Sequence, residues 1–170
     1  AKMVIEALKE GKHIFVEKPL ALTISELKDI VTAYNESPQV VMVGFNRRFA
    51  PHSLEAKKFI KEYGNDPLVI NIRVNTGYIP RERWVHDIQE GTRIIGEICH
   101  FVDLAYFFVD ADPIRIYAEN ITESEKYLPD DNVQVNIKFK DGSIAHITYV
   151  SSGDKSLGRE RVEVYGNGGV

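Results

Sequence analysis

One lysine in this sequence stands where a side chain can reach a reacting group. Lys18 lies in the stretch HIFVEKPLALT, in which a short apolar run, Ile14 to Val16, is followed by an acid, a base and a proline. Pro19 has no backbone donor and restricts the residue before it, so the predicted strand ends there and holds Lys18 extended. A solvated charge pair before a turn would also explain Glu17 and Lys18, and the rest of the sequence has to decide.

One histidine lies in the most apolar segment of the chain, RIIGEICHFVDLAYFF, which predicts a helix over residues 94–109. His100 and Asp103 are three residues apart on one face of this helix. Gly96 and Glu97 lie one turn earlier on the same side. Ionisable groups on so apolar a helix are costly unless they are satisfied or used. His100 is therefore either a general base or a core histidine bonded to a backbone carbonyl, whereas Asp103 is expected to bond local donors.

Polar side chains also follow the apolar run at residues 40–44, which predicts a second parallel strand. Asn46, Arg47 and Arg48 come directly after this run, at the end of the strand where open α/β sheets bind their ligands. These side chains could bind hydroxyl groups or a carboxylate of a ligand, or they could form the solvated start of a helix.

A long polar and aromatic loop is predicted over residues 78–92. Loops of this length inside compact domains are often functional. Its Tyr78 and Trp84 could line a sugar pocket, although packing would also explain each of them.

A lysine at a strand end and a histidine on a helix would supply the acid–base pair for oxidation of a secondary alcohol, with the hydride passing to a separate acceptor. This reaction removes the hydroxyl proton while a hydride leaves the carbon. A histidine with a pKa near neutrality is a suitable general base, and a lysine within hydrogen-bond reach stabilises the developing alkoxide. If Lys18 and His100 face one cleft, the strand ends so as to aim the lysine into an active site, and Glu17 anchors the turn.

Residues 1–45 predict one half of a doubly wound α/β domain. A helix over residues 3–10 is followed by Gly11 as its stop, and a second helix begins at a capping box from Thr23 to Glu26. Helix, strand, helix and strand with short links indicate crossover units on a parallel sheet. The all-apolar strands are of the type that is covered on both faces. The second helix is expected to bury four residues: Leu27, Ile30, Val31 and Tyr34.

Residues 46–170 predict an α+β lobe, in which an open, mainly antiparallel β-sheet is covered by helices. A helix is expected over residues 52–63, in addition to the apolar helix. Strands are expected at residues 67–76, 114–121, 133–139, 144–150 and 161–165.

A hairpin is predicted between two of these strands, because Asp141-Gly142 is a strong two-residue turn signal. One face of the hairpin should pack on the apolar helix. The other face, carrying Ile147 or Tyr149, should pack against a second subunit.

Composition and charge narrow the class of protein. The chain has 170 residues, 44% of them apolar, and a net charge of −4 from interspersed acids and bases. It contains no basic block that would support a nucleic-acid partner, and no apolar run of the roughly 18 residues that a membrane span requires. Its first residues predict an amphipathic helix rather than a secretory signal. A single cysteine, Cys99, excludes an internal disulfide and offers no zinc spacing, so we expect a cytoplasmic protein without a metal site.

The chain is expected to be a piece of a longer protein. It opens inside a predicted helix, and a further strand would naturally follow Val170. No Gly-x-Gly-x-x-Gly occurs, so the phosphate-binding turn of a dinucleotide fold is expected outside these residues.

Three motifs occur in an order and at distances that resemble one family. They are Glu17-Lys18-Pro19 at a strand end, Val43-Gly44-Phe45-Asn46-Arg47-Arg48-Phe49 at the next, and Gly96-Glu97-x-x-His100-x-x-Asp103 on the apolar helix. Over essentially the whole chain they resemble the glucose-fructose oxidoreductase / inositol dehydrogenase (Gfo/Idh/MocA) family of nicotinamide-dependent oxidoreductases. The family usually carries an aspartate where this chain has Gly96. Glu97 is adjacent, but a one-residue shift turns a side chain by about 100° around a helix.

The resemblance implies an oxidoreductase that uses NAD or NADP to act on a secondary hydroxyl of a sugar, a sugar derivative or a cyclitol. It implies catalytic roles for Lys18 and His100, and a homo-oligomer that associates through its β-sheet. The residues implied near the cofactor are Glu17, Lys18 and Pro19. Those implied near the substrate are Asn46, Arg47, Arg48, Tyr78, Trp84, Arg93 and Glu97.

Two other functions fit the same residues. A related lyase or glycosidase could use the pair in a transient oxidation, and a lobe without catalytic activity could keep the fold for binding or assembly. Product analysis with NAD(P) and candidate sugars separates these possibilities.

Overall fold

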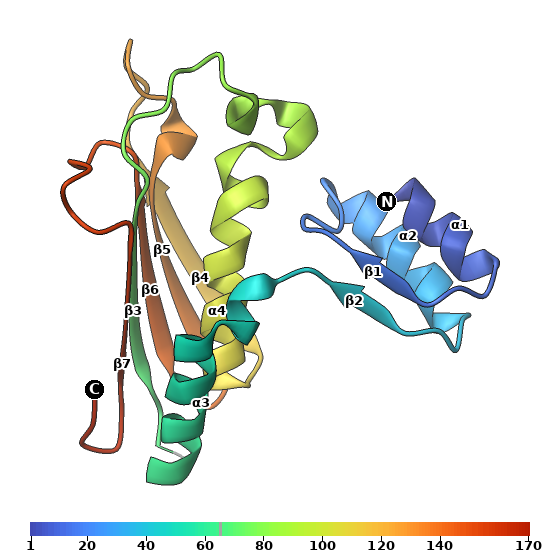
Figure 1. Cartoon of the computed structure of the whole chain (residues 1–170), viewed down its shortest axis with the longest axis horizontal. Helices are drawn as coiled ribbons and strands as arrows, with labels where there is room; N and C mark the ends of the chain where they lie inside the picture. The colour runs from blue at the N-terminus through green and yellow to red at the C-terminus, as the bar shows by residue number, and fades with distance from the viewer. Residues whose placement is uncertain (65) are drawn as a thin grey trace.

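The computed structural model describes residues 1–64 and 66–170, which form a smaller and a larger lobe joined after β2 (Figure 1). The smaller lobe contains α1 (Lys2–Lys9), β1 (Ile14–Val16), α2 (Ile24–Asn35) and β2 (Val41–Val43). β1 and β2 pair in parallel. The predicted alternation of helix and strand on a parallel sheet is therefore confirmed. No helix within the described ranges has the length and apolar character needed to cross a membrane.

α2 begins where the capping box predicts. The hydroxyl of Thr23 accepts from the backbone N–H of Glu26 at 3.1 Å, and the Glu26 carboxylate accepts from the N–H of Thr23 at 3.1 Å. These bonds satisfy donors that an uncapped helix end leaves free. α1 ends at Lys9, and Gly11 beyond it has a positive φ of 67°, a conformation that favours glycine.

The small sheet is covered on one face. Both helices pack on the side that carries Ile14 and Val41, where Val4 and Leu8 are buried. Side chains alternate along a strand, so Phe15 points the other way and is 65% exposed. The expectation that these strands are covered on both faces is wrong for the described residues.

α2 also buries less than predicted. Ile30 is buried, but Leu27, Val31 and Tyr34 are each at least 40% exposed. Two strands of three residues give the helix little sheet to cover, so one row of apolar side chains packs and the flanking rows do not.

The larger lobe combines one sheet with several helical segments. The helical segments are η1 (Asn46–Phe49), α3 (Pro51–Tyr63), η2 (Trp84–His86), η3 (Ile88–Glu90), η4 (Ile94–Ile98), α4 (Cys99–Val109) and η5 (Pro129–Asp131). The strands are β3 (Val69–Asn75), β4 (Pro113–Asn120), β5 (Asn132–Phe139), β6 (Ile144–Val150) and β7 (Glu160–Tyr165).

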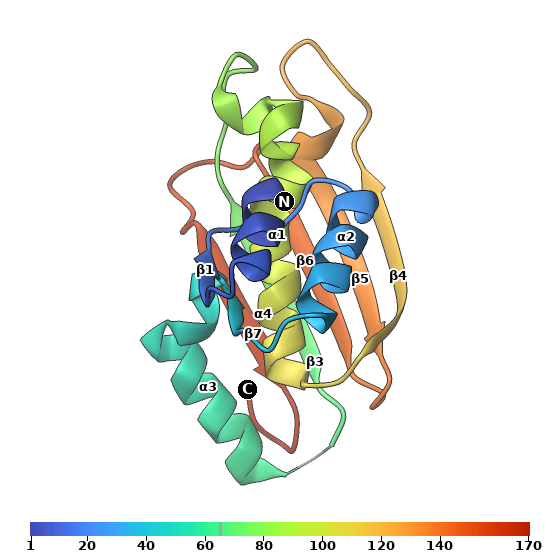
Figure 2. The same ribbon diagram turned by 90° about the vertical axis from the view of Figure 1, so that its right-hand side faces the viewer.

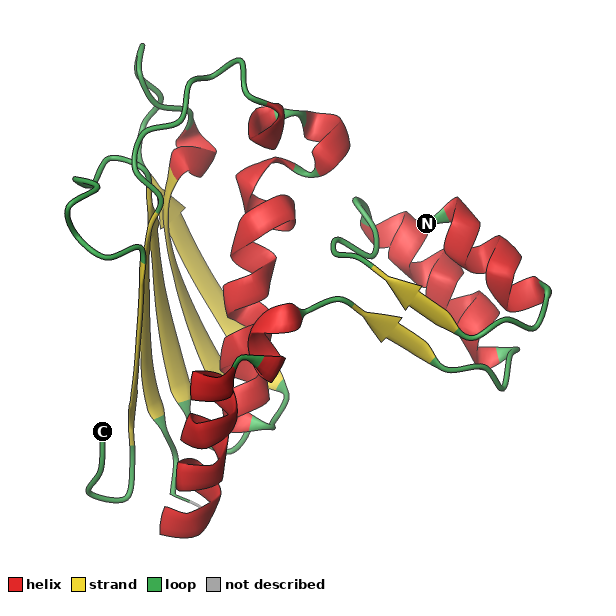
Figure 3. Cartoon of the chain, in the orientation of Figure 1, coloured by secondary structure: helices red, strands yellow, loops and turns green. Residues whose placement is uncertain are grey.

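These strands lie in the order β4-β5-β6-β3-β7, with β3 parallel to β6 and every other pair antiparallel. Helices α3 and α4 lie on one face of the sheet (Figure 3). Seen from the smaller lobe, α1 and α2 lie in front of α4, and the sheet lies behind it (Figure 2). The predicted α/β segment followed by an α+β lobe with an open, mainly antiparallel sheet is confirmed.

α4 supplies the centre of the larger core. Its Phe101, Leu104 and Phe108 are buried against β-strand residues such as Ile72 and Ile137. Full burial of one such side chain contributes about 1.5–3 kcal/mol. The helix is thereby fixed on the sheet, and its first turn is fixed with it.

The β5–β6 hairpin forms as predicted, with a positive φ of 99° at Gly142. Ile147 and Tyr149 are two residues apart, so they share one face of β6. That face is the one packed on α4, and the two side chains are 0% and 1% exposed. The expectation that one of them lies on the outer face is therefore wrong.

The outer face of the hairpin is mainly polar, although Ile144, 45% exposed, also lies on it. The ring of His146 makes hydrogen bonds of 2.9 Å with Asn136 and of 2.9 Å with Thr148. Association through this sheet remains a prediction, now without the apolar residues that we expected to drive it.

Candidate active site

Lys18 extends from the smaller lobe to the segment that leads into α4. It lies two residues beyond the end of β1, and the Lys18–Pro19 peptide bond is cis. Its Nζ donates to the carbonyl oxygen of Gly96 and lies 3.8 Å from Glu97 Oε1. The fold therefore brings Lys18 into contact with Gly96 of the helix motif, although these residues are 78 positions apart.

A π-helical turn precedes α4 and sets the direction of Glu97. The predicted single helix over 94–109 is divided into this turn, Ile94–Ile98, and the α-helix that begins at Cys99. The N–H of Cys99 bonds the carbonyl of Ile94, five residues earlier. Such a turn fits one more residue than an α-helical turn and so rotates the residues before it relative to those after it. Gly96 therefore offers Lys18 its carbonyl oxygen, while Glu97 offers a carboxylate.

His100 lies in the first turn of α4 and is 6% exposed. Phe45 meets its ring edge-on, with the ring centroids 6.1 Å apart. Its Nδ1 is buried, and none of the described residues makes a hydrogen bond with it. The bond to a backbone carbonyl that a purely structural core histidine would make is thus not seen in the described part of the chain.

The surroundings of His100 keep its imidazole neutral. Its pKa is lowered from 6.5 to about 4, chiefly by burial and then by the positive charges of Arg47 and Lys18, while the negative Glu160 opposes them. The imidazole is therefore neutral at neutral pH and free to accept a proton, but with a pKa of about 4 it is a weaker base than the near-neutral histidine expected from the sequence.

The two arginines of η1 are both held by carboxylates of this chain. Arg47 bonds Glu160 through Nη2 at 2.6 Å and Nε at 3.3 Å, and its guanidinium lies 4.6 Å from the centre of the Phe101 ring. Arg48 makes a two-point contact with Asp103, with Nε 2.6 Å from Oδ2, and Asp103 raises the pKa of Arg48. Arg48 therefore ties η1 to α4, and Asp103 bonds a nearby donor as expected.

Three further predicted residues lie at or beside the strand ends. Asn46 begins η1 with its side chain exposed. Glu17 lies against the backbone of Gly44, where an added Cβ would come within 2.8 Å of Glu17 Oε2, so it fits the anchoring role expected of it. Pro19 is half-buried directly after Lys18.

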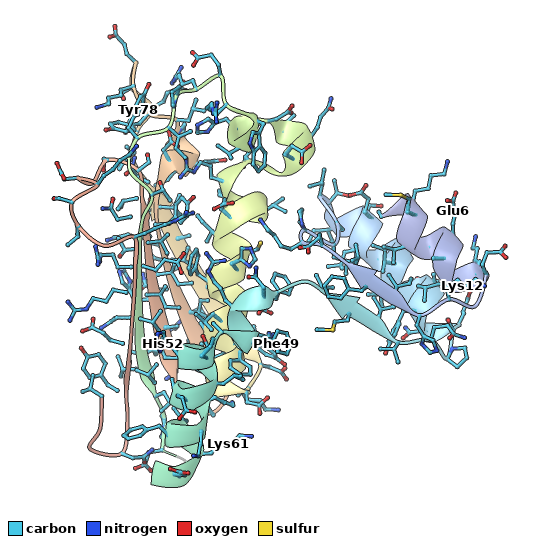
Figure 4. All side chains as sticks on the ribbon, viewed as in Figure 1. Glu6, Lys12, Phe49, His52, Lys61 and Tyr78 are labelled. Carbon is cyan, nitrogen blue, oxygen red and sulfur yellow. The ribbon has the colours of Figure 1, made fainter. Side chains whose placement is uncertain are left out.

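The structure does not bring Tyr78 and Trp84 to this site. Both line a separate surface hollow together with Pro80 and Arg83. Tyr78 packs edge-on against Tyr127 at 5.9 Å, and Figure 4 places it at the far end of the larger lobe from Phe49 of η1. The expectation that this loop shares one depression with the lysine and histidine is not met.

Arg93 does not contact solvent and so has no surface to offer a substrate. Its guanidinium donates to the hydroxyl of Tyr149 at 2.8 Å and to that of Thr76 at 2.7 Å, and it lies 3.3 Å from Asp131 Oδ1. These partners come from the sheet and from η5. Arg93 is thus a support that fixes the loop before α4, which corrects the role that the resemblance implied.

Two residues of the site went unnoticed in the sequence. Glu160, the partner of Arg47, begins β7, and Arg159 precedes it. Arg159 lies 3.7 Å from Glu97 and 3.9 Å from Glu160. The resulting alternation of charge is called the charge chain below; its members are Lys18, Glu97, Arg159, Glu160 and Arg47. No local sequence pattern indicates that β7 contributes Glu160 to the site, since Glu160 lies 113 positions after its partner Arg47.

The site is defined by this charge chain rather than by a deep hollow. The hollow between α3 and β7, which includes Phe59 and Val164, contains neither Lys18 nor His100. We place the chemistry at the charge chain and at His100, whose imidazole feels the charges of Arg47, Lys18 and Glu160, because general acid–base work needs titratable groups near one another.

Family comparisons cover both lobes. Residues 1–45 match the family described as "Oxidoreductase family, NAD-binding Rossmann fold", and residues 56–170 match the "GFO/IDH/MocA C-terminal domain". The chain therefore belongs to the Gfo/Idh/MocA oxidoreductase family, as its three motifs indicated.

Two curated relatives come from Bacillus subtilis (strain 168). The uncharacterized oxidoreductase YrbE is 29% identical over 176 residues, covering 99% of this chain and 50% of that protein. The scyllo-inositol 2-dehydrogenase (NAD(+)) is 30% identical over 174 residues, covering 98% of this chain and 49% of that protein. The chain spans about half the length of these curated relatives.

Solved structures share the fold. The myo-inositol dehydrogenase from Lactobacillus casei, in complex with NAD(H) and myo-inositol, superposes with a TM-score of 0.80 at 23% identity, covering 99% of this chain and 49% of that one. The WlbA dehydrogenase from Bordetella pertussis, in complex with NADH and UDP-GlcNAcA, gives a TM-score of 0.80 at 19% identity, covering 97% and 52%.

Proposed function

We propose that this chain carries the catalytic pair and part of the substrate site of an oxidoreductase that uses NAD or NADP. The reaction is oxidation of a secondary hydroxyl of a sugar, a sugar derivative or a cyclitol. Membership of the Gfo/Idh/MocA family supports this proposal, as do relatives named as inositol dehydrogenases. We further propose that residues 1–45 belong to a dinucleotide-binding domain and residues 46–170 to a substrate-binding and oligomerisation domain.

One observation carries the proposal. The Lys18 ammonium of the smaller lobe contacts the turn that leads into His100 of the larger lobe, and its charge contributes to the lowered pKa of the imidazole. An ammonium donor and a neutral imidazole, supplied by separate elements 82 positions apart in sequence (100 − 18), form the pair that alcohol oxidation needs.

The residues present fit the nicotinamide end of the cofactor. Lys18 and Pro19 follow the C-terminal end of β1, and Gly44 follows that of β2, at the edge of a parallel sheet where such ligands bind. The buried Gly44 leaves room there for the carboxylate of Glu17. No glycine-rich turn for the pyrophosphate lies in this sequence. When bound, the nicotinamide supplies the hydride acceptor.

The chain's own residues would handle the proton and the developing charge. His100 accepts the hydroxyl proton on its neutral ring. Lys18 donates a hydrogen bond to the same oxygen, which stabilises the alkoxide as the C–H bond breaks. Glu97, 3.8 Å from the ammonium, orients Lys18.

The test is product analysis with the full-length protein. NAD⁺ and NADP⁺ are each offered with a panel of cyclitols and sugars, and formation of reduced cofactor is followed together with the ketone product. Stoichiometric ketone and reduced cofactor support the proposal. Product formation without net cofactor reduction would indicate a transient-oxidation lyase or glycosidase. Tight cofactor binding without any turnover would indicate a non-catalytic lobe.

A further inference from the structure

Arg159 differs from the other two guanidinium groups near the site in having free donors. Arg47 and Arg48 are each held at two points by a carboxylate. Arg159 has neighbours only at 3.7 and 3.9 Å, and the described residues offer it no acceptor within hydrogen-bond distance. Its side chain is 61% exposed. A guanidinium has five N–H donors, so all of them are available to a ligand.

Glu97 is the matching acceptor. Its two oxygens lie 3.8 Å from Lys18 Nζ and 3.7 Å from Arg159 Nη2, and none of the described residues donates a hydrogen bond to either. Its side chain is 25% exposed. Arg159 and Glu97 thus form an ion pair at 3.7 Å without a direct hydrogen bond, and a hydroxyl beside the pair can contact both side chains.

The loop that carries Arg159 is held firmly in place. The carbonyl of Arg159 accepts from the N–H of Asn75 at 2.7 Å. The Asn75 side chain bonds the carbonyl of Asp154 at 2.8 Å, and Asn132 accepts from Ser152 at 2.7 Å. Because the backbone of this loop is already fixed, ligand binding has to order only the side chain of Arg159.

We propose that Arg159 and Glu97 together bind one hydroxyl group of an uncharged polyol, and that they select against substrates with a carboxylate or phosphate at this position. A hydroxyl both accepts and donates, so it can accept from Arg159 and donate to Glu97 at once. A carboxylate only accepts, so it could bond Arg159 but could not donate to Glu97, whose like charge it would then face. The inference rests on the proposed function in that the bound polyol is the alcohol to be oxidised.

The test measures ligand binding and turnover separately in the full-length protein with NAD⁺ present. The ligands are myo-inositol, scyllo-inositol, D-glucose and D-glucuronate, the last differing from D-glucose by a carboxylate in place of a hydroxymethyl group. The variant is Arg159→Ala. Its matched control is Arg161→Ala, because Arg161 lies two residues further on, is 65% exposed and pairs with Glu163 on β7.

In the parent protein at least one neutral polyol should bind, and D-glucose should bind at least about tenfold more tightly than D-glucuronate. Arg159→Ala should weaken binding of the neutral ligand about tenfold to a hundredfold, the range for losing a charged hydrogen-bond partner, and Arg161→Ala should not. If binding follows this pattern while no NAD⁺ is reduced, the inference stands and the oxidoreductase proposal fails. Binding of none of the four, equal binding of D-glucuronate and D-glucose, or equal behaviour of the two variants would overturn the inference.

Discussion

At the scale of single residues, the state of each ionisable group follows from its neighbours. His100 is neutral because burial and two cations, Arg47 and Lys18, disfavour the imidazolium form. Lys18 lies 3.8 Å from the carboxylate of Glu97. The site thus contains a neutral imidazole and a lysine, the two groups that the proposed alcohol oxidation uses.

The pH profile of kcat/KM should show this low pKa. The proton acceptor is the neutral ring, so activity is lost as pH falls through the pKa, which is about 4 here. At pH 5.5 a histidine with its ordinary pKa near 6.5 would have lost about tenfold in activity, whereas His100 should have lost almost none. Steady-state rates between pH 5 and pH 8 check this.

Arg47→Met removes one of the cations that depress the pKa, so its acid limb should move to higher pH. Arg161→Met, which alters a distant exposed arginine, should leave the limb in place. An acid limb near pH 6.5 in the parent protein, or no movement in the Arg47 variant, would contradict this account of His100.

Arg93→Met should destabilise the larger lobe strongly. The substitution leaves the buried carboxylate of Asp131 without its cation, and removing one partner of a buried pair costs about 3–5 kcal/mol. Denaturant unfolding gives the free energy. Arg83→Met, an exposed arginine of the same loop, should change it by no more than about 0.5 kcal/mol. Unchanged stability with a raised KM would instead restore Arg93 to the substrate site.

At the scale of elements, the π turn at Ile94–Ile98 joins a rigid helix to the lysine of the other lobe. α4 is fixed by its apolar contacts with the sheet. The number of residues in the turn therefore decides which side chain points toward Lys18. With an ordinary α-helical turn, Glu97 would point about 100° away from its present direction.

Deleting Ile95 should convert the π turn into an α-helical turn and separate Glu97 from Lys18. Turnover should fall about tenfold or more, while the helical content by circular dichroism stays the same. Ile95→Ala keeps the length of the turn and should leave turnover within about twofold. A deletion variant as active as the parent would show that the phase of this turn does not matter to the chemistry.

Much of the fold could be predicted because its signals are local. The Thr23 capping box and the Asp141-Gly142 hairpin each depend on a few adjacent residues, and both form as expected. Burial in the smaller lobe was overestimated, since Leu27 and Val31 are apolar in sequence but their burial depends on how much sheet lies beneath α2. Apolar periodicity predicts which face packs, but not whether that face is covered.

Less of the site could be predicted because its contacts are distant in sequence. Lys18 and the Gly96–His100 motif were found, but the π turn that orients Glu97 has no sequence signature. In the sequence Arg93 has the charge and the position of a site residue, but in the structure Tyr149 and Asp131 bind its buried guanidinium. Arg159 comes from a loop before the last strand, and only the fold brings it to Glu97.

At the scale of the whole molecule, the site lies between two lobes of unequal size. The smaller lobe contributes Lys18, and the larger contributes His100, Arg47 and the carboxylates around them. Any motion of one lobe against the other would change the distance between Lys18 and His100, so the contact of Lys18 with Gly96 matters for the geometry of the pair.

Residues 1–170 alone should not bind NAD⁺ or NADP⁺ with useful affinity. The pyrophosphate depends on the backbone donors of a glycine turn and a helix start, and this sequence contains no such motif. Calorimetric titration of a folded sample, checked by circular dichroism, should give no heat of binding at micromolar cofactor. Micromolar binding would show that these residues hold the cofactor by another route.

The central claim is that Lys18 and His100 act as one catalytic pair, and single-substitution kinetics on the full-length protein test it most directly. Lys18→Ala and His100→Ala should each lower kcat about a hundredfold or more, with the free energy of unfolding changed little. A core histidine would behave in the opposite way, since its loss would destabilise the lobe. Unfolding of the His100 variant, or turnover in either variant close to that of the parent protein, would contradict the account.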